Sequence, residues 1–157
     1  MSAPVNAIAG AATERVLMLG LGGEYLAIDA AIVREIMDPA PVTTVPGARS
    51  FVSGVINVRG EIVPLADLRV RLGMPATEHG PDTRFVVIEV EAGDEPEPIL
   101  VTVVADKVHE VCDLDCPPAS TVPRIGMAWP PELIRGVALW KDDFVILPNL
   151  PALLGLN

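Results

Sequence analysis

One segment of the chain occurs twice, and this internal repeat limits the possible folds more than any other feature of the sequence. Residues 54–74 align without a gap with residues 136–156, at an offset of 82 positions. A second pair of similar segments lies upstream, residues 33–38 and residues 108–113, at an offset of 75. Because both pairs occur in the same order along the chain, the repeats predict two similar subdomains.

The first copy of the repeat has the pattern of a β-hairpin with a charged tip. Two apolar runs flank Arg59 and Gly60. Glycine adopts a positive φ without a steric clash, so a two-residue turn can connect Val58 to Glu61. Both faces of this hairpin carry apolar side chains, and we therefore expect both faces to be covered. The second copy keeps a cation at the tip, as Lys141.

The composition favours an all-β fold with short helices. Clusters of valine and isoleucine are separated by turn-forming residues, and the 16 prolines and 13 glycines suit short strands and tight turns. Hydrophobic residues make up 50% of the chain and aromatic residues 4%, so the core must be aliphatic. Helical segments are expected at residues 30–32, 67–72 and 150–154. A chain of 157 residues suits one domain or two small interlocked ones, with a border at residues 77–82.

The charge of the chain restricts its partners. A net charge of -10 argues against binding to nucleic-acid phosphates or to an anionic membrane surface, and it favours a protein partner or a small ligand. No apolar run approaches the roughly 20 residues that a membrane-spanning helix needs. Residues 1–12 lack the positive region of a secretory signal, so we expect a disordered N-terminal tail on a cytoplasmic protein.

No arrangement of residues predicts catalysis. His79 lies in a turn-rich segment and His109 alternates with apolar residues, and neither accompanies a nucleophile motif, a phosphate-binding glycine loop or a metal-ligand spacing. Cys112 and Cys116 could be metal ligands, but no second cluster completes a four-ligand set. Cys112 also aligns with Met37, which favours an apolar structural role. We expect a protein that is not an enzyme, with no metal site and no cofactor.

Glu35 and Arg59 are the polar residues that the sequence singles out. Glu35 is a charge within an apolar strand, so its carboxylate must reach either solvent or a cation. Arg59 is at a hairpin tip, where its guanidinium can point outward. Two interpretations remain open: an intramolecular surface ion pair between the two residues, or contacts with a partner.

Several motifs resemble those of the CheW-like family of chemotaxis coupling proteins. They are Gly-Glu-Tyr-Leu-Ala-Ile-Asp at 23–29, Val-Arg-Glu-Ile at 33–36, Phe-Val-Ser-Gly-Val-Ile-Asn-Val-Arg-Gly at 51–60, Ile-Val-Pro-Leu-Ala-Asp-Leu at 62–68 and Leu-Ile-Arg-Gly-Val at 133–137. The resemblance implies a CheW-like domain over residues 13–157, made of two small five-stranded SH3-like β-barrels around a shared hydrophobic seam. The subdomains would cover about residues 13–82 and 83–157, with strands open to exchange between them.

The same resemblance implies a function. Such a protein is a non-catalytic adaptor that couples chemoreceptors to the regulatory domain of a CheA-type histidine kinase in a bacterial chemosensory array. It is cytoplasmic and is recruited to the inner face of the membrane through the receptor arrays. An apolar groove between the subdomains would receive the helical tip of the receptor. The alternative function is that of a small-ligand or metal-sensing β-barrel.

Individual residues match positions that are functional in the family. Those that match receptor or array contacts are Val33, Glu35, Gly54, Arg59 and Gly60. Those that match the kinase-binding region are Thr102, Val104 and Asp106. Thr102 stands where the family usually has glycine, and Leu-Pro-Asn-Leu at residues 147–150 replaces the usual aspartate-bearing last strand.

Overall fold

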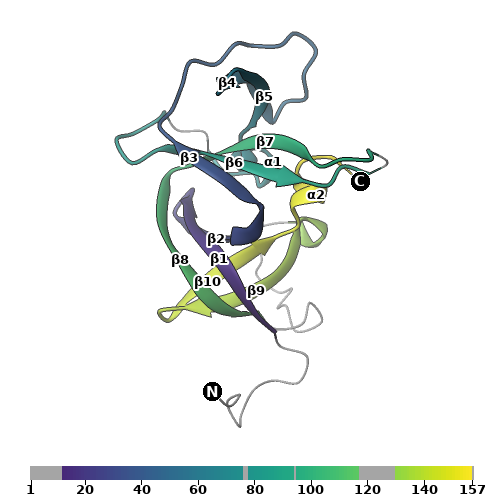
Figure 1. Cartoon of the computed structure of the whole chain (residues 1–157). Coiled ribbons are helices and arrows are strands. Elements are labelled where there is room, and N and C mark those ends of the chain that lie inside the picture. Colours follow the sequence, from purple (N-terminus) through teal and green to yellow (C-terminus); the bar gives the residue numbers. More distant parts are fainter. Residues whose placement is uncertain (1–11, 76–77, 94, 117–129, 157) are drawn as a thin grey trace.

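Two five-stranded sheets dominate the computed structural model, which describes residues 12–75, 78–93, 95–116 and 130–156. Sheet A contains, in spatial order, β8 (Lys107–Cys116), β1 (Ala12–Leu21), β2 (Glu24–Asp29), β10 (Asp143–Pro148) and β9 (Ile134–Trp140). Sheet B contains β3 (Val33–Met37), β6 (Arg84–Val90), β7 (Ile99–Ala105), β5 (Glu61–Ala66) and β4 (Val52–Val58). Sheet B lies above sheet A in Figure 1. The all-β prediction is confirmed, and closure of each sheet into a barrel stays a prediction.

Short helices lie at the ends of the strands. They are η1 (Ala30–Ile32) between β2 and β3, α1 (Leu68–Arg71) after β5, η3 (Pro131–Leu133) before β9, and α2 (Leu150–Leu153) after β10. Asp67 caps α1, as predicted, because its carboxylate accepts a hydrogen bond from the N–H of Arg69. No helix in the described part of the chain has the length and apolar character needed to cross a membrane.

The repeat found in the sequence recurs in the strand order. β1 to β5 with α1 form one repeat, and β6 to β10 with α2 form the other. When each strand of sheet A is replaced by the strand at the same place in the other repeat, the order β8-β1-β2-β10-β9 becomes β3-β6-β7-β5-β4, which is sheet B. Each repeat therefore contributes its first hairpin to one sheet and its last three strands to the other. Residues 77–82 separate the two repeats, whereas each sheet draws strands from both sides of that border.

The chain crosses between the sheets at two described places. η1 takes it from β2 in sheet A to β3 in sheet B, and a single residue, Asp106, takes it from β7 in sheet B to β8 in sheet A. Ala12, the last residue of the expected N-terminal tail, belongs to β1. The rest of that expected tail lies outside the described residues.

The central hairpin, formed by β4 and β5, has the predicted register. Val58 pairs with Glu61, so the turn consists of Arg59 and Gly60. Arg59 has a φ of 50° and Gly60 a φ of 90°, and a type I′ turn requires positive values at both positions. The backbone twist of this turn type matches the twist of the strands that it joins.

The expectation that both faces of this hairpin are covered is wrong at Ile62, whose exposed fraction is 70%. The inner face is buried in a cluster that includes Ile56 and Val63. At the edge of the sheet, the backbone of Thr43 exchanges two hydrogen bonds with Val55 of β4, at 2.8 and 2.9 Å, and so extends sheet B beyond β4. Backbone hydrogen bonds of this kind lie in the plane of the sheet, so the pairing does not cover the face on which Ile62 lies.

In the part of the chain that the structure describes, buried apolar side chains form three clusters, and the largest lies between the sheets. β1 illustrates the division, because Val16 and Met18 belong to the cluster on the far face of sheet A, whereas Leu17 and Leu19 belong to the cluster between the sheets. The third cluster lies on the far face of sheet B, around Phe85. Alternate side chains of a strand point to opposite faces, so such strands are buried on both. The cluster between the sheets is the hydrophobic seam that was expected.

Candidate functional site

Glu35 and Arg59 form an ion pair on the surface of sheet B. Nε of Arg59 donates a hydrogen bond to Oε1 of Glu35 at 2.5 Å, which joins the tip of the central hairpin to β3. This hydrogen bond raises the pKa of Arg59. The arginine side chain is 81% exposed and the glutamate side chain 25%. The intramolecular pair is therefore present, and its exposure also leaves Arg59 accessible to a partner.

Local contacts fix the backbone that carries Arg59. The N–H of Gly60 donates to Oδ1 of Asn57 at 2.8 Å, which closes the turn from within. A Cβ at Gly60 would meet no atom within 4 Å, so the glycine serves the positive φ of the turn and not a close contact. The guanidinium of Arg59 is thus presented from a rigid support.

Val33 and Glu35 flank a β-bulge in β3. Val33 pairs with Ile88 and Glu35 with Val87, so Arg34 is the additional residue. Val33 is half-buried and packs against the seam cluster. The two predicted contact residues of β3 therefore differ in surroundings, since Glu35 is held at the surface by its ion pair.

Gly54 is buried beneath the segment that bridges to β4. Its φ is 152°, and a Cβ there would stand 2.2 Å from the carbonyl oxygen of Thr43. Only glycine tolerates this combination of dihedral angle and backbone approach. Any effect of Gly54 on partner binding would act through the packing of this segment, because the glycine itself presents no surface.

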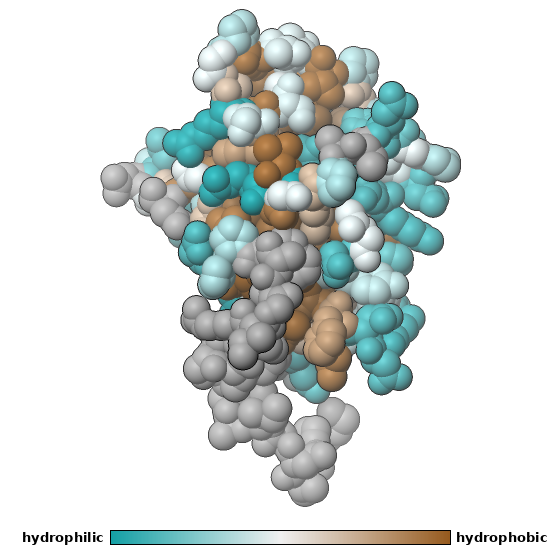
Figure 2. Space-filling view, turned by 180° about the vertical axis from the view of Figure 1, so that it is seen from behind, coloured by the Kyte–Doolittle hydropathy of each residue, from teal (hydrophilic) through white to brown (hydrophobic). Residues whose placement is uncertain are grey.

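Apolar side chains are exposed next to the ion pair along the chain. Ile36, which follows Glu35 in β3, is 43% exposed, and Ile62 in β5 is 70% exposed. Figure 2 shows one face of the molecule, on which apolar side chains reach the surface in separate patches among hydrophilic ones. A charged group beside exposed apolar side chains is a composition common at protein interfaces.

The second repeat contains an equivalent ion pair. Nζ of Lys141, at the tip of the β9–β10 hairpin, lies 3.2 Å from Oε1 of Glu110 on β8. These residues align with Arg59 and Glu35 at the offsets of 82 and 75, and Lys141 also has a φ of 50°. Exposed apolar residues recur here too, as Val111, Leu139 and Phe144. The sequence contained this signal, because both partners lie within the repeated segments.

An aromatic cluster supports the second hairpin. The rings of Tyr25, His109 and Trp140 have centroids between 5.1 and 5.7 Å apart. Nζ of Lys141 lies 4.7 Å from the ring centroid of Trp140, within range of a cation–π interaction. His109 is therefore part of a packed aromatic group.

Both cysteines are at least partly buried, and their thiols favour the protonated form. Cys112 is half-buried and Cys116 buried, and burial raises the pKa of both thiols, that of Cys116 to about 12. A high thiol pKa disfavours the thiolate form that binds metal ions. Within the described residues, no group of three or more histidine, cysteine, aspartate or glutamate side chains could hold a metal ion.

A groove of about 370 Å³ opens between the two sheets. Its apolar floor includes Ile28, Ile32, Val90 and Leu150, and its rim includes Glu14, Asp29, Glu89, Glu91 and Arg135. Arg135 makes two hydrogen bonds to the carboxylate of Glu14, at 2.7 and 3.0 Å. These bonds lower the pKa of Glu14. Glu14 and Arg135 neutralise each other, and Glu89 pairs with Arg34, so Asp29 and Glu91 give the rim its negative character.

Comparison with known families places the domain. The CheW-like domain matches residues 15–156. This chain belongs to the CheW-like family. Its CheW relatives include Chemotaxis protein CheW of Rhizobium meliloti (strain 1021), which is 33% identical over 130 residues and aligns over 83% of this chain and 80% of that protein. Chemotaxis protein CheW of Klebsiella aerogenes is 30% identical over 153 residues, with 97% of this chain and 89% of that protein aligned.

A solved structure shows the same CheW-like fold. The scaffolding protein TtCheW from Thermoanaerobacter tengcongensis superposes with a TM-score of 0.76 over 98% of this chain and 93% of that chain, at 23% identity. The two five-stranded sheets described above are therefore the architecture of a known CheW structure.

Two of the three residues that the sequence resemblance predicted for kinase binding are buried in the interior of this CheW-like domain. Thr102 is 0% exposed and Val104 3%, both on β7. Asp106 is partly exposed, accepts a hydrogen bond from the N–H of Gly22 at 2.8 Å and pairs with Arg69 at 3.4 Å. Thr102 and Val104 could influence a partner only through the packing of β7, and their role stays a prediction. The cluster around Arg69 was missed by the sequence analysis.

Proposed function

We propose that this protein is a non-catalytic adaptor that couples chemoreceptors to the regulatory domain of a CheA-type histidine kinase in a bacterial chemosensory array. Membership of the CheW-like family supports this proposal. The observation that carries it is the Glu35–Arg59 pair, which a rigid hairpin tip presents at the surface position expected for an array contact. The protein acts in the cytoplasm and is recruited to the inner face of the membrane through the receptors.

Receptor and array contacts are made by Val33, Glu35, Arg59 and Gly60, while Gly54 holds the hairpin that carries two of them. A rigid tip lowers the ordering cost of binding, because only the long arginine side chain must be immobilised.

The helical tip of the receptor binds in the groove between the sheets. Its apolar floor, which includes Ile32 and Leu150, suits the apolar stripe of a helix. The negative rim favours a helix with basic side chains beside that stripe. Ile32 directly precedes Val33, so the groove and the ion-pair surface are contiguous along the chain.

The proposal is tested by reconstitution. The purified protein is mixed with the cytoplasmic tip of a chemoreceptor and a CheA-type kinase from the same bacterium, and receptor-dependent autophosphorylation of the kinase is measured with and without the protein. We expect receptor control of the kinase only when the protein is present, and direct binding to both partners by calorimetry. Absence of binding to both partners would overturn the proposal.

A further inference from the structure

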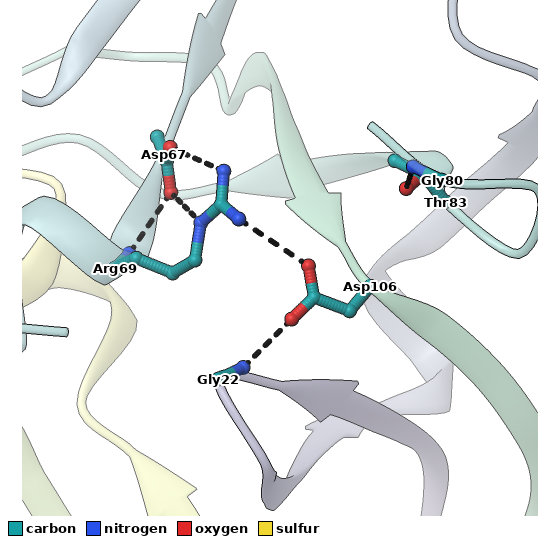
Figure 3. Close-up of polar contacts among 6 residues, drawn as sticks. All are labelled: Gly22, Asp67, Arg69, Gly80, Thr83 and Asp106. Carbon is teal, nitrogen blue, oxygen red and sulfur yellow. Dashed lines mark hydrogen bonds and ion pairs between the residues drawn. The ribbon is translucent and has the colours of Figure 1, made fainter. Parts of the chain in front are cut away.

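A charged network connects the two sheets at α1. Asp67 and Arg69 lie at the end of β5 in sheet B, and the guanidinium of Arg69 donates to both carboxylate oxygens of Asp67 at 2.8 and 2.9 Å. Arg69 also reaches Oδ1 of Asp106 at 3.4 Å, and Oδ2 of Asp106 accepts the N–H of Gly22 at 2.8 Å (Figure 3). Gly22 lies in the turn between β1 and β2, so the network runs from sheet B to sheet A.

A second arginine of α1 makes another connection. Nε and Nη2 of Arg71 donate to the carbonyl oxygens of Leu153 and Ala152, at 3.1 and 3.0 Å. These carbonyls belong to α2, which follows β10 of sheet A, and the last carbonyls of a helix lack partners within the helix itself. Met74, just after α1, adds a packing contact, because a Cβ at Gly22 would stand 2.4 Å from its sulfur.

The two repeats differ at this point. Arg69 and Arg71 align at the offset of 82 with Pro151 and Leu153 in α2, and neither of those side chains can donate a hydrogen bond. The cap of the helix is nevertheless retained, as Asn149 accepts the N–H of Ala152. In the second repeat, α2 therefore lacks the arginines with which α1 of the first repeat connects the sheets.

The apolar seam and the two arginines of α1 differ in how they affect the orientation of one sheet relative to the other. Apolar contacts hold the two sheets together, but the hydrophobic effect is non-directional and does not by itself specify one angle between them. Charge-assisted hydrogen bonds require particular distances and angles, and a guanidinium that is 4% exposed cannot exchange them freely for water. Arg69 is therefore placed to select one orientation among those that the seam permits.

We propose that α1 is a clamp that fixes the orientation of sheet B relative to sheet A, with Arg69 and Arg71 as positioning residues for partner surfaces that span both sheets. The partner part of this inference rests on the proposed adaptor function, and the clamp itself does not. Arg69 is 3% exposed and cannot contact a partner, so any effect on binding must act through orientation.

Residual dipolar couplings of backbone amides test the clamp in the protein alone. In the wild type, one alignment tensor should fit the couplings of both sheets. In Arg71→Met and in Asp106→Asn, each sheet should keep its own good fit, but the fit to a single tensor should be lost. Asp106→Asn keeps an acceptor for the N–H of Gly22 while it removes the charge opposite Arg69. These variants avoid the unpaired buried carboxylate of Asp67 that Arg69→Met would leave.

Arg135→Met is the matched control, because Arg135 and its partner Glu14 both lie in sheet A. It should preserve the single-tensor fit. A single-tensor fit in both Arg71→Met and Asp106→Asn would overturn the clamp. Failure of the adaptor function would appear separately, as absence of binding by the wild type, and would leave the couplings unchanged.

Discussion

Lys141 lies 3.2 Å from Glu110, in the second repeat, at the place that Arg59 and Glu35 occupy in the first. The molecule therefore presents the same charge arrangement twice, once on each sheet, with the cation at a hairpin tip. The surroundings differ, since Lys141 lies over the ring of Trp140. A partner that binds one copy must distinguish it by these neighbours, because the charges alone are alike.

The charge of Arg59 is expected to matter for binding and hardly at all for folding. In Arg59→Glu, Tm should change by no more than about 2 °C, because substitutions at exposed tips have small effects on stability. Affinity for receptor or kinase should fall at least about tenfold, because the reversal removes a contact and adds a repulsion. Thermal unfolding and calorimetric binding on the same preparation check this.

Lys141→Glu is the control for this experiment, since it makes the same charge change in the equivalent turn. If Arg59 binds a partner specifically, the two reversals should differ in the partner that they affect. Equal losses for every partner would indicate a general effect of net charge, and unchanged affinity in Arg59→Glu would show that the residue is a solvated turn residue.

Gly54→Ala should destabilise the protein by at least about 2 kcal/mol, because the residue combines a positive φ with backbone contact. The new Cβ would stand 2.2 Å from the carbonyl oxygen of Thr43. Urea unfolding measures the loss. Gly60→Ala is the comparison, because its φ is 90° but no atom lies within 4 Å of the added Cβ, and it should cost less. A larger loss in Gly60→Ala would contradict the role given to the Thr43 contact.

Thr102→Val should stabilise the protein by about 1 kcal/mol, because it removes a buried hydroxyl that is not hydrogen-bonded. Thr102 is 0% exposed, and its Oγ1 has no hydrogen-bond partner within the described residues. Thr83→Val is the matched control: Thr83 is 3% exposed, but its Oγ1 accepts the N–H of Gly80 at 2.8 Å (Figure 3). Thr83→Val should lower the free energy of unfolding by about 1 to 2 kcal/mol. Destabilisation by both changes in chemical unfolding would refute the prediction for Thr102.

The stability of the protein should fall in alkaline solution partly through Cys116. Burial raises the pKa of its thiol from 9.0 to about 12 in the folded protein. Between these pH values the unfolded chain loses the proton and the folded one keeps it, so this contribution favours unfolding as pH rises above 9 and is absent below it. Urea unfolding at pH 7, 9 and 10.5 should show a steeper decline for the wild type than for Cys116→Ala. Parallel declines would exclude this cause.

Features set by neighbouring residues were predictable from the sequence. The turn at Arg59 and Gly60 and the cap at Asp67 follow from local steric and hydrogen-bonding preferences, and both have the expected geometry. The Glu35–Arg59 pair was one of two open interpretations, because a sequence pattern does not show which side chains meet in space. Its counterpart in the second repeat was within reach, since the same alignment contains both residues.

Features that depend on distant segments were not predictable in the same way. The hairpin face at Ile62 is open because the distant segment at Thr43 pairs with the edge of β4 and does not lie over that face. Gly54 matched a contact position, yet its burial comes from the same distant bridge. In the network around Arg69, Asp106 contacts Arg69, 37 positions away in the sequence, and Gly22, 84 positions away. No periodicity of the sequence predicts contacts between such distant residues.

The exchange of strands between the repeats makes the halves of the chain dependent on each other. A chain that carried a single repeat would have a first hairpin without the three strands that complete its sheet. It could satisfy the exposed strand edges only by pairing reciprocally with another copy, as in a domain-swapped dimer. The protein thus has the construction of such a dimer with its two subunits joined into one polypeptide, and neither half has a complete sheet of its own.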